Sequence, residues 1–190
     1  MSDALILIDT DSAIALAHSD KACQLISESP CITVTKTVWN ELTDSRKQDE
    51  NTRREAERIE QVLSDNPAPV PVSQDTLNSA GGSYNYGEQG IRDYLEHGDR
   101  DVSTVLFFDN DLAPMSADFD TKFFPYTKIF DIYDTEKEEA IEEALKTAKA
   151  RGWTAKPHLQ RLLVRADLIS GAEYVYADVM VMRMPDYTDL

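Results

Sequence analysis

The most constraining feature of this chain is an apolar run that ends abruptly in carboxylates. Residues 4–8 read ALILI and are followed at once by Asp9, Thr10 and Asp11. A short apolar run bounded in this way predicts a buried strand. A charge at the end of such a strand is costly unless it is solvated, hydrogen-bonded or bound to a cation. The position of Asp9 and Asp11 therefore raises the question of what neutralises them.

A second apolar run repeats the pattern. STVLFFDND at 103–111 predicts another buried strand, and it ends at Asp109 and Asp111. In a parallel sheet the carboxyl ends of the strands share one edge, where ligands collect. Two unit charges about 4 Å apart repel by roughly 4 kcal/mol at an effective dielectric constant near 20. Clustered carboxylates therefore need protons or divalent cations, and their hard oxygens suit Mg²⁺ or Mn²⁺.

The other patterns alternate between strand and helix, which predicts an α/β fold with a mainly parallel sheet. The first helix is expected to start near Asp11 or Ser12, and a T-x-x-E capping box at Thr135 and Glu138 predicts the start of a later one that Gly152 stops. The remaining expected elements are strands at 31–36 and 127–134, helices at 37–44, 51–65 and 88–98, an extended link or edge strand at 66–73 and a loop at 78–87.

The chain is expected to form one domain over 1–152, followed by an extension, 153–190, that completes the domain or forms an interface. Within this extension HLQRLLVRADLIS predicts an amphipathic helix, and EYVYADVMVMRM at 173–184 alternates like a strand. No apolar run is long enough to cross a bilayer, and no basic segment precedes the first apolar stretch. These features predict a soluble, cytoplasmic protein with no membrane partner and with Cys23 and Cys31 reduced.

The chain is strongly acidic, with 35 Asp and Glu against 19 Lys and Arg and a net charge of −16. This charge argues against nonspecific adhesion to nucleic acid or to an anionic membrane. A nucleic acid substrate met through a local basic patch or a bound metal is still compatible with it. Five arginines are candidate phosphate contacts: Arg54, Arg58, Arg92, Arg161 and Arg165.

Four of the acids also have purely structural explanations. Asp11 is placed to cap the first helix, and Asp111 to form a turn. Glu41 is compatible with an exposed helical position, and Glu88 with a favourable interaction at a helix N-terminus. One acid at one strand end is therefore weak grounds for a site, and the order of all of them along the chain carries more weight.

That order resembles the PIN-domain nucleases over roughly residues 4–150. LILIDTDSAIALA is similar to the first metal-binding motif, with Asp9 as its acid and Thr10 where the family often has a hydroxyl. ITVTKTVWNEL resembles the second motif and supplies Glu41. YNYGEQGIRDYL is similar to the G-E helix start of one branch, which supplies Glu88, and VLFFDNDLAP resembles the fourth motif, with Asp109.

The chain departs from the family pattern in three places. Asp11 stands where the first motif usually has asparagine, and the D-N-D sequence leaves Asp109 and Asp111 competing for the fourth acidic position. The segment at 112–134 is longer than in compact members. No single motif is specific, so the resemblance rests on four motifs in order.

The resemblance implies a PIN-like three-layer sandwich with a central, mainly parallel sheet flanked by helices. It implies a Mg²⁺- or Mn²⁺-dependent endoribonuclease in which Asp9, Glu41, Glu88 and Asp109 hold the metal and catalyse hydrolysis. Asp111 is a further candidate ligand, with Thr10 and Asp11 in support. Small stand-alone members are often toxins of toxin–antitoxin pairs, which implies RNA as substrate, a basic antitoxin or other protein inhibitor as partner, and a homodimer.

Two other interpretations stay open. LILIDTDSA also resembles the opening of haloacid-dehalogenase-type phosphatases, with Asp9 as nucleophile and Asp11 as general acid. Ala13 stands where that family usually has Thr or Val, VLFFDND lacks the glycine before its acidic pair, and no lysine motif is evident. The other interpretation is a noncatalytic PIN-like scaffold that binds RNA or protein. The presence of all four acids favours an active nuclease over the scaffold.

Overall fold

A four-stranded parallel sheet forms the centre of the protein. The computed structural model describes residues 4–44, 50–64, 68–79, 86–108, 110–152 and 156–171. The strands lie in the order β2-β1-β3-β4 and all pair in parallel. Their bounds are β1 (Leu5–Ile8), β2 (Ile32–Thr33), β3 (Val102–Phe107) and β4 (Lys122–Pro125). The α/β class and the parallel sheet expected from the sequence are confirmed.

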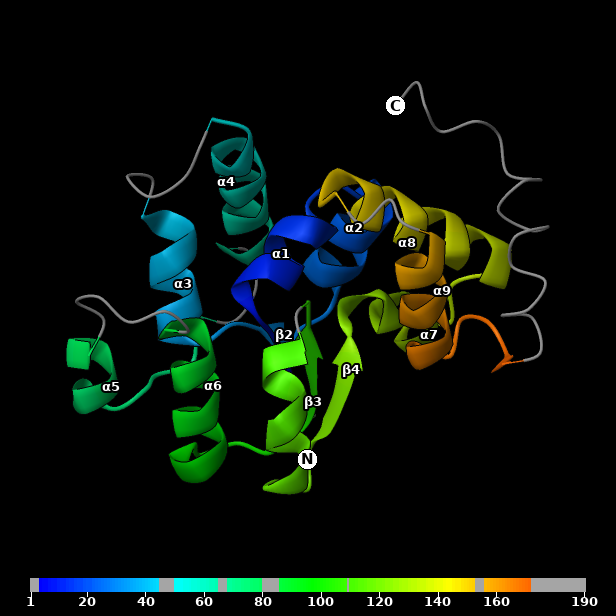
Figure 1. Ribbon diagram of the computed structural model, residues 1–190. Coiled ribbons are helices and arrows are strands. Elements are labelled where there is room, and N and C mark those ends of the chain that lie inside the picture. The colour runs from blue at the N-terminus through cyan, green and yellow to red at the C-terminus, as the bar shows by residue number, and fades with distance from the viewer. Residues whose placement is uncertain are drawn as a thin grey trace.

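Helices flank this sheet. In Figure 1, α3, α5 and α6 lie on one side of the strands, α7 and α9 on the other, and α1 and α2 above them. This arrangement is consistent with a three-layer sandwich. The helices of the described residues are α1 (Thr10–Leu16), α2 (Asp20–Glu28), α3 (Lys36–Thr43), α4 (Glu50–Ser64), α5 (Gln74–Asn78), α6 (Tyr86–His97), α7 (Ile129–Ile132), α8 (Lys137–Ala150) and α9 (Lys156–Arg165), with 3-10 helices η3 (Asn110–Ala117) and η4 (Tyr126–Lys128).

The strand order places a switch point between β1 and β3. The connection from β1 leads to β2 on one side, whereas the connection from β3 leads to β4 on the other. Where connections diverge in this way, the carboxyl ends of the two strands border a crevice, and open parallel sheets bind their ligands there. Ile8 pairs with Leu106 in the register of these strands, so the carboxyl ends of β1 and β3 lie side by side.

The core explains why β1 is apolar without alternation. All four residues of β1 are buried, since helices cover both faces of the sheet. The largest fully buried side chains include Leu5, Leu7, Ile59, Tyr126 and Phe130. The opening apolar run is thus the central strand of the core, as its sequence predicts.

The expected strand at 127–134 is wrong. The chain forms η4 and α7 there, and the strand that completes the sheet is β4, immediately before them. Lys128 is buried and its ammonium pairs with Asp131 at 2.6 Å, three residues later, and with Asp167 at 3.0 Å. Residues three apart share a helix face but lie on opposite faces of a strand. A short apolar run alone does not distinguish these two cases.

The expected capping box at Thr135 and Glu138 is also wrong. Helix α8 begins at Lys137, after Glu136, and no side chain caps it. The backbone N–H of Thr135 donates instead to the carbonyl of Phe130 at 2.9 Å, which closes the turn after α7. The expected end of this helix is confirmed, because Gly152 adopts a φ of +76° just beyond it.

Most other expected elements are present. Helices α3, α4 and α6 lie where the patterns place them, and Val70 of the expected edge segment forms a parallel bridge with Thr35. The strand expected at 173–184 and most of the loop expected at 78–87 lie outside the described residues. No helix in the described ranges is both long and apolar enough to cross a membrane.

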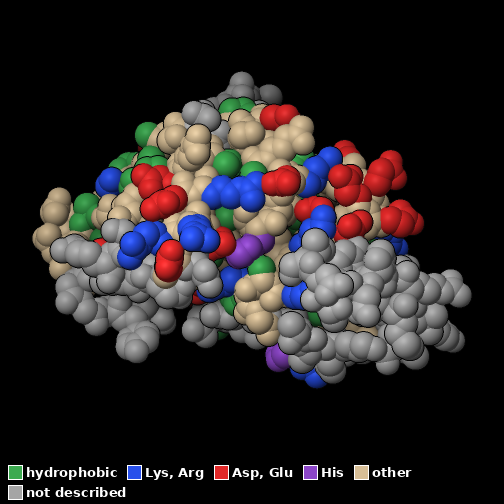
Figure 2. Space-filling view, turned by 90° about the horizontal axis from the view of Figure 1, so that it is seen from above, with side chains coloured by type: hydrophobic (Ala, Val, Ile, Leu, Met, Phe, Trp, Pro, Cys, Tyr) green, Lys and Arg blue, Asp and Glu red, His purple; other side chains and the backbone are tan. Residues whose placement is uncertain are grey.

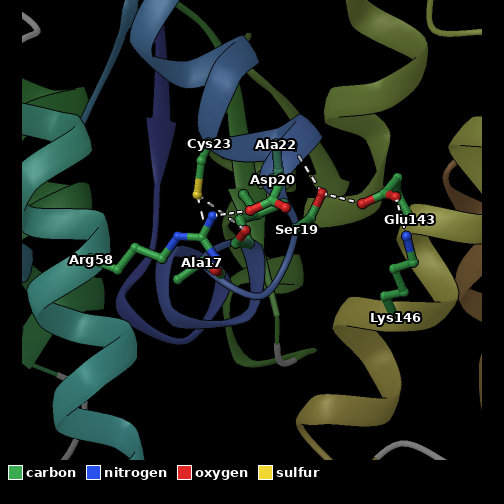
Figure 3. A network of polar contacts seen from close by, with 9 residues as sticks. Ala17, Ser19, Asp20, Ala22, Cys23, Arg58, Glu143 and Lys146 are labelled. Atoms are coloured by element: carbon green, nitrogen blue, oxygen red, sulfur yellow. Dashed lines mark hydrogen bonds and ion pairs between the residues drawn. The ribbon is translucent and has the colours of Figure 1, made fainter. Parts of the chain in front are cut away.

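A buried polar network fixes α8 against the α1–α2 connection (Figure 3). Ser19 caps α2 by accepting a hydrogen bond from the N–H of Ala22, and its own hydroxyl donates to Glu143 of α8 at 2.6 Å. The Glu143 carboxylate also accepts from the Lys146 ammonium at 2.6 Å. Each polar group is therefore satisfied, as burial requires. The network positions the helix that ends at Arg151.

Candidate active site

Asp9 lies at the switch point and bridges the ends of β1 and β3. It is the N-cap of α1: its Oδ1 accepts a hydrogen bond from the N–H of Ser12 at 2.7 Å. Its Oδ2 accepts a second one from the N–H of Phe108 at 3.2 Å. Asp9, not Asp11, therefore caps the first helix, because it is the residue whose extended backbone ends the strand.

The Asp9 carboxyl is buried, with 6% of its surface exposed. Burial raises its pKa from an ordinary 3.8 to about 7, and the nearby charge of Asp11 adds to this effect. The hydrogen bonds from Ser12 and Phe108 act in the opposite direction because they favour the ionised form. Asp9 is thus a carboxyl that releases its proton near neutral pH unless a positive charge assists it.

Glu41 brings together three of the four motif segments. It lies on α3, which Thr35 caps at the end of the β2 segment. Its Oε2 accepts a hydrogen bond from the Thr10 hydroxyl, and its Oε1 accepts one from the N–H of Gly87 at 3.2 Å. Thr10 follows Asp9, and Gly87 precedes Glu88. One carboxylate is thereby connected to the first and third motifs.

Two glycines allow α6 to approach α3 this closely. A Cβ on Gly87 would lie 2.9 Å from Glu41 Oε2 and 3.1 Å from Thr10 Oγ1, and a Cβ on Gly90 only 1.8 Å from Thr37 Oγ1. Real Cβ atoms do not approach other atoms so closely, so Gly90 has no room for a side chain, and a Cβ at position 87 would displace the end of the Glu41 side chain. The glycine before Glu88 thus has a mechanical role: it lets the first turn of α6 reach the Glu41 carboxylate.

The other predicted acids are placed less completely. Glu88 lies in the first turn of α6 and is half-buried. Asp109 lies outside the described residues, although it directly follows Phe108, whose N–H binds Asp9. Asp111 falls in η3, where only its backbone is described. The choice between Asp109 and Asp111 as fourth acid therefore stays a prediction.

Asp11 points to a different partner, Arg151. Its carboxylate accepts a hydrogen bond from Arg151 Nη2, across 140 residues of sequence. The guanidinium also lies over the ring of Phe108, 5.4 Å from the centroid, and that ring stacks on Tyr126. Arg151 is the residue that sequence reasoning missed. The only local signal is its position at the end of the helix before Gly152, and nothing in that position indicates a partner on α1.

Several of the arginines considered as phosphate contacts lie beside acidic side chains. Arg54 pairs with Glu50, Arg58 with Asp20, and Arg92 with Glu96 and Asp118. Of the two on α9, Arg165 lies over the ring of Phe107, 5.5 Å from its centroid, and Arg161 is exposed.

The donor chemistry at the switch point fits a hard divalent cation. Asp9 and Glu41 present carboxylate oxygens, the ligand type that Mg²⁺ and Mn²⁺ prefer. Within the described residues, however, no group of three or more His, Cys, Asp or Glu side chains is close enough to hold a metal. Asp109 lies outside the described residues, so the metal stays a prediction.

Comparisons of the chain with protein-family models, with curated proteins and with solved structures find no match. The PIN-domain resemblance therefore rests on the four motifs and their order in the sequence. The fold class rests on the sheet and its helices, independently of any relative.

Proposed function

We propose that this protein is a Mg²⁺- or Mn²⁺-dependent ribonuclease that hydrolyses RNA at the carboxyl edge of the sheet. The observation that carries the proposal is the set of hydrogen bonds joining the four motif segments. Glu41 binds Thr10 and Gly87, and Asp9 binds the N–H of Phe108. Segments far apart in the sequence thus meet at one switch point, where a parallel sheet binds ligands.

In this proposal Asp9, Glu41, Glu88 and Asp109 hold one or two divalent ions. Such ions supply an activated water and stabilise the charge that develops on the phosphate. The chain itself contributes orientation. Thr10 and the Gly87 N–H hold the two oxygens of Glu41, and the Ser12 and Phe108 N–H groups hold those of Asp9.

The environment of Asp9 supports this role. Its raised pKa means that part of the Asp9 population is protonated at neutral pH. A ligand to a cation must be ionised, so cation binding should release a proton from this carboxyl. A bound cation would stabilise the ionised form of this buried carboxyl, as a metal ligand requires.

The phosphatase interpretation is less compatible with these contacts. Asp11, the proposed general acid, is ion-paired with Arg151 at the described site. As a general acid its side chain would have to face the substrate, whereas here it faces a guanidinium.

The test is cleavage of a mixed pool of structured and single-stranded RNA with Mg²⁺ or Mn²⁺. The comparisons are an EDTA control, Asp9→Asn, Glu41→Gln and a matched control, Glu57→Gln, at an exposed position of α4. We expect cleavage by the natural protein and by Glu57→Gln, and none with EDTA or with either site variant.

Circular dichroism would establish that the variants fold. Undiminished cleavage by folded Asp9→Asn and Glu41→Gln would refute the assignment of these residues. A natural protein that cuts no RNA with either metal would favour the noncatalytic scaffold instead. The toxin role, a basic antitoxin and a homodimer are further proposals that follow only if cleavage is found.

A further inference from the structure

Arg151 lies beside the acidic site without belonging to any of the four motifs. It follows the last turn of α8, and its guanidinium lies over Phe108, whose N–H binds Asp9. The same guanidinium binds Asp11, two residues after Asp9. This cation is thus held between the segments that follow β1 and β3, next to the proposed metal ligands.

One donor of this guanidinium, Nε, has no acceptor among the described residues. Arginine has five N–H donors, and the hydrogen bond to Asp11 uses Nη2. Arg151 Nε is buried, and among the described residues no atom accepts its hydrogen bond. A buried donor without an acceptor is unfavourable, and here it belongs to a side chain that is still 24% exposed. Asp11 therefore does not satisfy the guanidinium completely, and the side chain stays partly accessible to an anion from solvent.

The guanidinium is also held in place. It stacks on the Phe108 ring, which in turn stacks on Tyr126, with ring centroids 5.6 Å apart. Helix α8 is anchored by the hydrogen bond between Glu143 and Ser19. A planar cation on a fixed aromatic surface loses little freedom when it binds a ligand.

The described residues on the face shown in Figure 2 form no broad patch of Lys and Arg side chains. Figure 2 shows Lys and Arg side chains mixed with Asp and Glu on the face seen from above, with acidic side chains gathered at one end of the view. Arg58 pairs with Asp20, and Lys21 with Glu139. In a protein with a net charge of −16, an RNA backbone needs a local cation as well as any metal.

We propose that Arg151 binds a phosphate group of the RNA backbone beside the acidic site, and that Asp11 holds the guanidinium until the phosphate replaces it. This inference rests on the proposed function, because it deepens the same site. Arginine binds phosphate through paired, charge-assisted hydrogen bonds. Asp11 is 46% exposed, so its carboxylate returns to solvent when the phosphate takes its place. A partly exposed ion pair contributes little to stability, so this exchange is easy.

The test measures binding separately from cleavage. Fluorescence anisotropy follows a short labelled single-stranded RNA with Ca²⁺ as the divalent ion, and a gel verifies that the RNA stays intact. We expect Arg151→Gln to weaken binding by about tenfold or more, as the loss of a charge-assisted pair implies. The salt dependence should fall by about one phosphate contact. Arg53→Gln, which removes the same charge from an exposed position of α4, should bind like the natural protein.

Two further variants separate phosphate binding from a purely structural role. Arg151→Lys keeps the charge but loses the paired geometry, so it should bind with intermediate affinity. Asp11→Asn removes the competing carboxylate and should bind RNA more tightly. A structural pair would give the opposite result, because loss of Asp11 would release Arg151 and weaken binding. These variants also decide the question if Arg151→Gln does not fold.

The outcomes distinguish this inference from the proposed function. Unchanged RNA affinity in Arg151→Gln, or weaker binding by Asp11→Asn, overturns the role of Arg151 even if Asp9→Asn abolishes cleavage. Absence of RNA binding by the natural protein overturns it as well. Arg151-dependent binding without cleavage under any metal would confirm the phosphate contact and refute the ribonuclease.

Discussion

The carboxylate of Glu41, on α3, accepts a hydrogen bond from the backbone N–H of Gly87 at the start of α6, with the two atoms 3.2 Å apart. The contact spans 46 positions of sequence and connects the second and third acidic motifs. It depends on the absence of a side chain at position 87, because the space for a Cβ is taken by Glu41 and Thr10. The close approach of α6 and α3 is therefore part of the candidate site.

Gly87→Ala should disturb the site more than the fold. The new Cβ would lie 2.9 Å from Glu41 Oε2, so the carboxylate must move away from the Gly87 N–H. We expect a loss of about 1–2 kcal/mol in the free energy of unfolding, as for other overpacked positions, and loss of metal-dependent cleavage. Urea denaturation measures the free energy of unfolding, and the RNA assay measures cleavage. Gly171→Ala, where the Cβ enters open space, is the control, and equal effects of the two would contradict the prediction.

Gly90→Ala should destabilise the packing of α6 on α3 more strongly. Its Cβ would meet Thr37 Oγ1 at 1.8 Å and two further Thr37 atoms at 2.8 Å. Alanine favours a helix over glycine by about 1 kcal/mol, but the clash requires the helices to separate, and we expect a net loss of about 2 kcal/mol. Chemical denaturation measures it. A variant as stable as the natural protein would contradict the prediction and show that Thr37 can move away from the new Cβ without cost.

The ionisation of Asp9 should make stability depend on pH in an unusual direction. The folded protein holds this proton up to a pKa of about 7, whereas the unfolded chain releases it near 3.8. Between these values the folded state binds more protons, so Asp9 lowers stability as pH rises, by up to about 1.4 kcal/mol per pH unit.

The measurement is the free energy of unfolding in EDTA at several pH values from 4 to 8 for the natural protein and Asp9→Asn. Other carboxylates contribute equally to both proteins, so the difference between the two isolates Asp9. We expect the natural protein to lose stability relative to the variant as pH increases toward 7. Parallel pH profiles would show that Asp9 ionises normally.

Ser19→Ala should cost more than a helix cap alone. Ser19 accepts from Ala22 N–H and donates to the Glu143 carboxylate, and it is fully buried. Loss of the cap costs about 1 kcal/mol, and loss of a hydrogen bond to the buried carboxylate adds about 1–2 kcal/mol. Ser73→Ala is the matched control, since Ser73 caps α5 at an exposed position. Equal losses in urea denaturation would mean that the Glu143 contact contributes nothing.

Patterns within short windows of the sequence predicted much of the fold. The buried strands β1 and β3 and the helices α3, α4 and α6 follow from apolar periodicity within short windows. The acids after each strand were found in the same way, because a carboxylate next to a buried run is visible without knowledge of distant contacts. The segment at 127–134 was mispredicted because a short apolar run fits both a strand and a helix. The backbone hydrogen bond from Tyr133 to Ile129 and the Lys128 ion pairs show that it is helical.

By itself, the sequence determined the α/β class and the positions of the candidate acids. Only the tertiary structure decided which groups face one another: Asp9 as the cap of α1, Glu41 against Gly87, and Asp11 against Arg151. The physical reason is that helix and strand signals arise between residues a few positions apart. Contacts between distant segments depend instead on the order of the strands and on how closely two helices approach, and here two glycines set that distance.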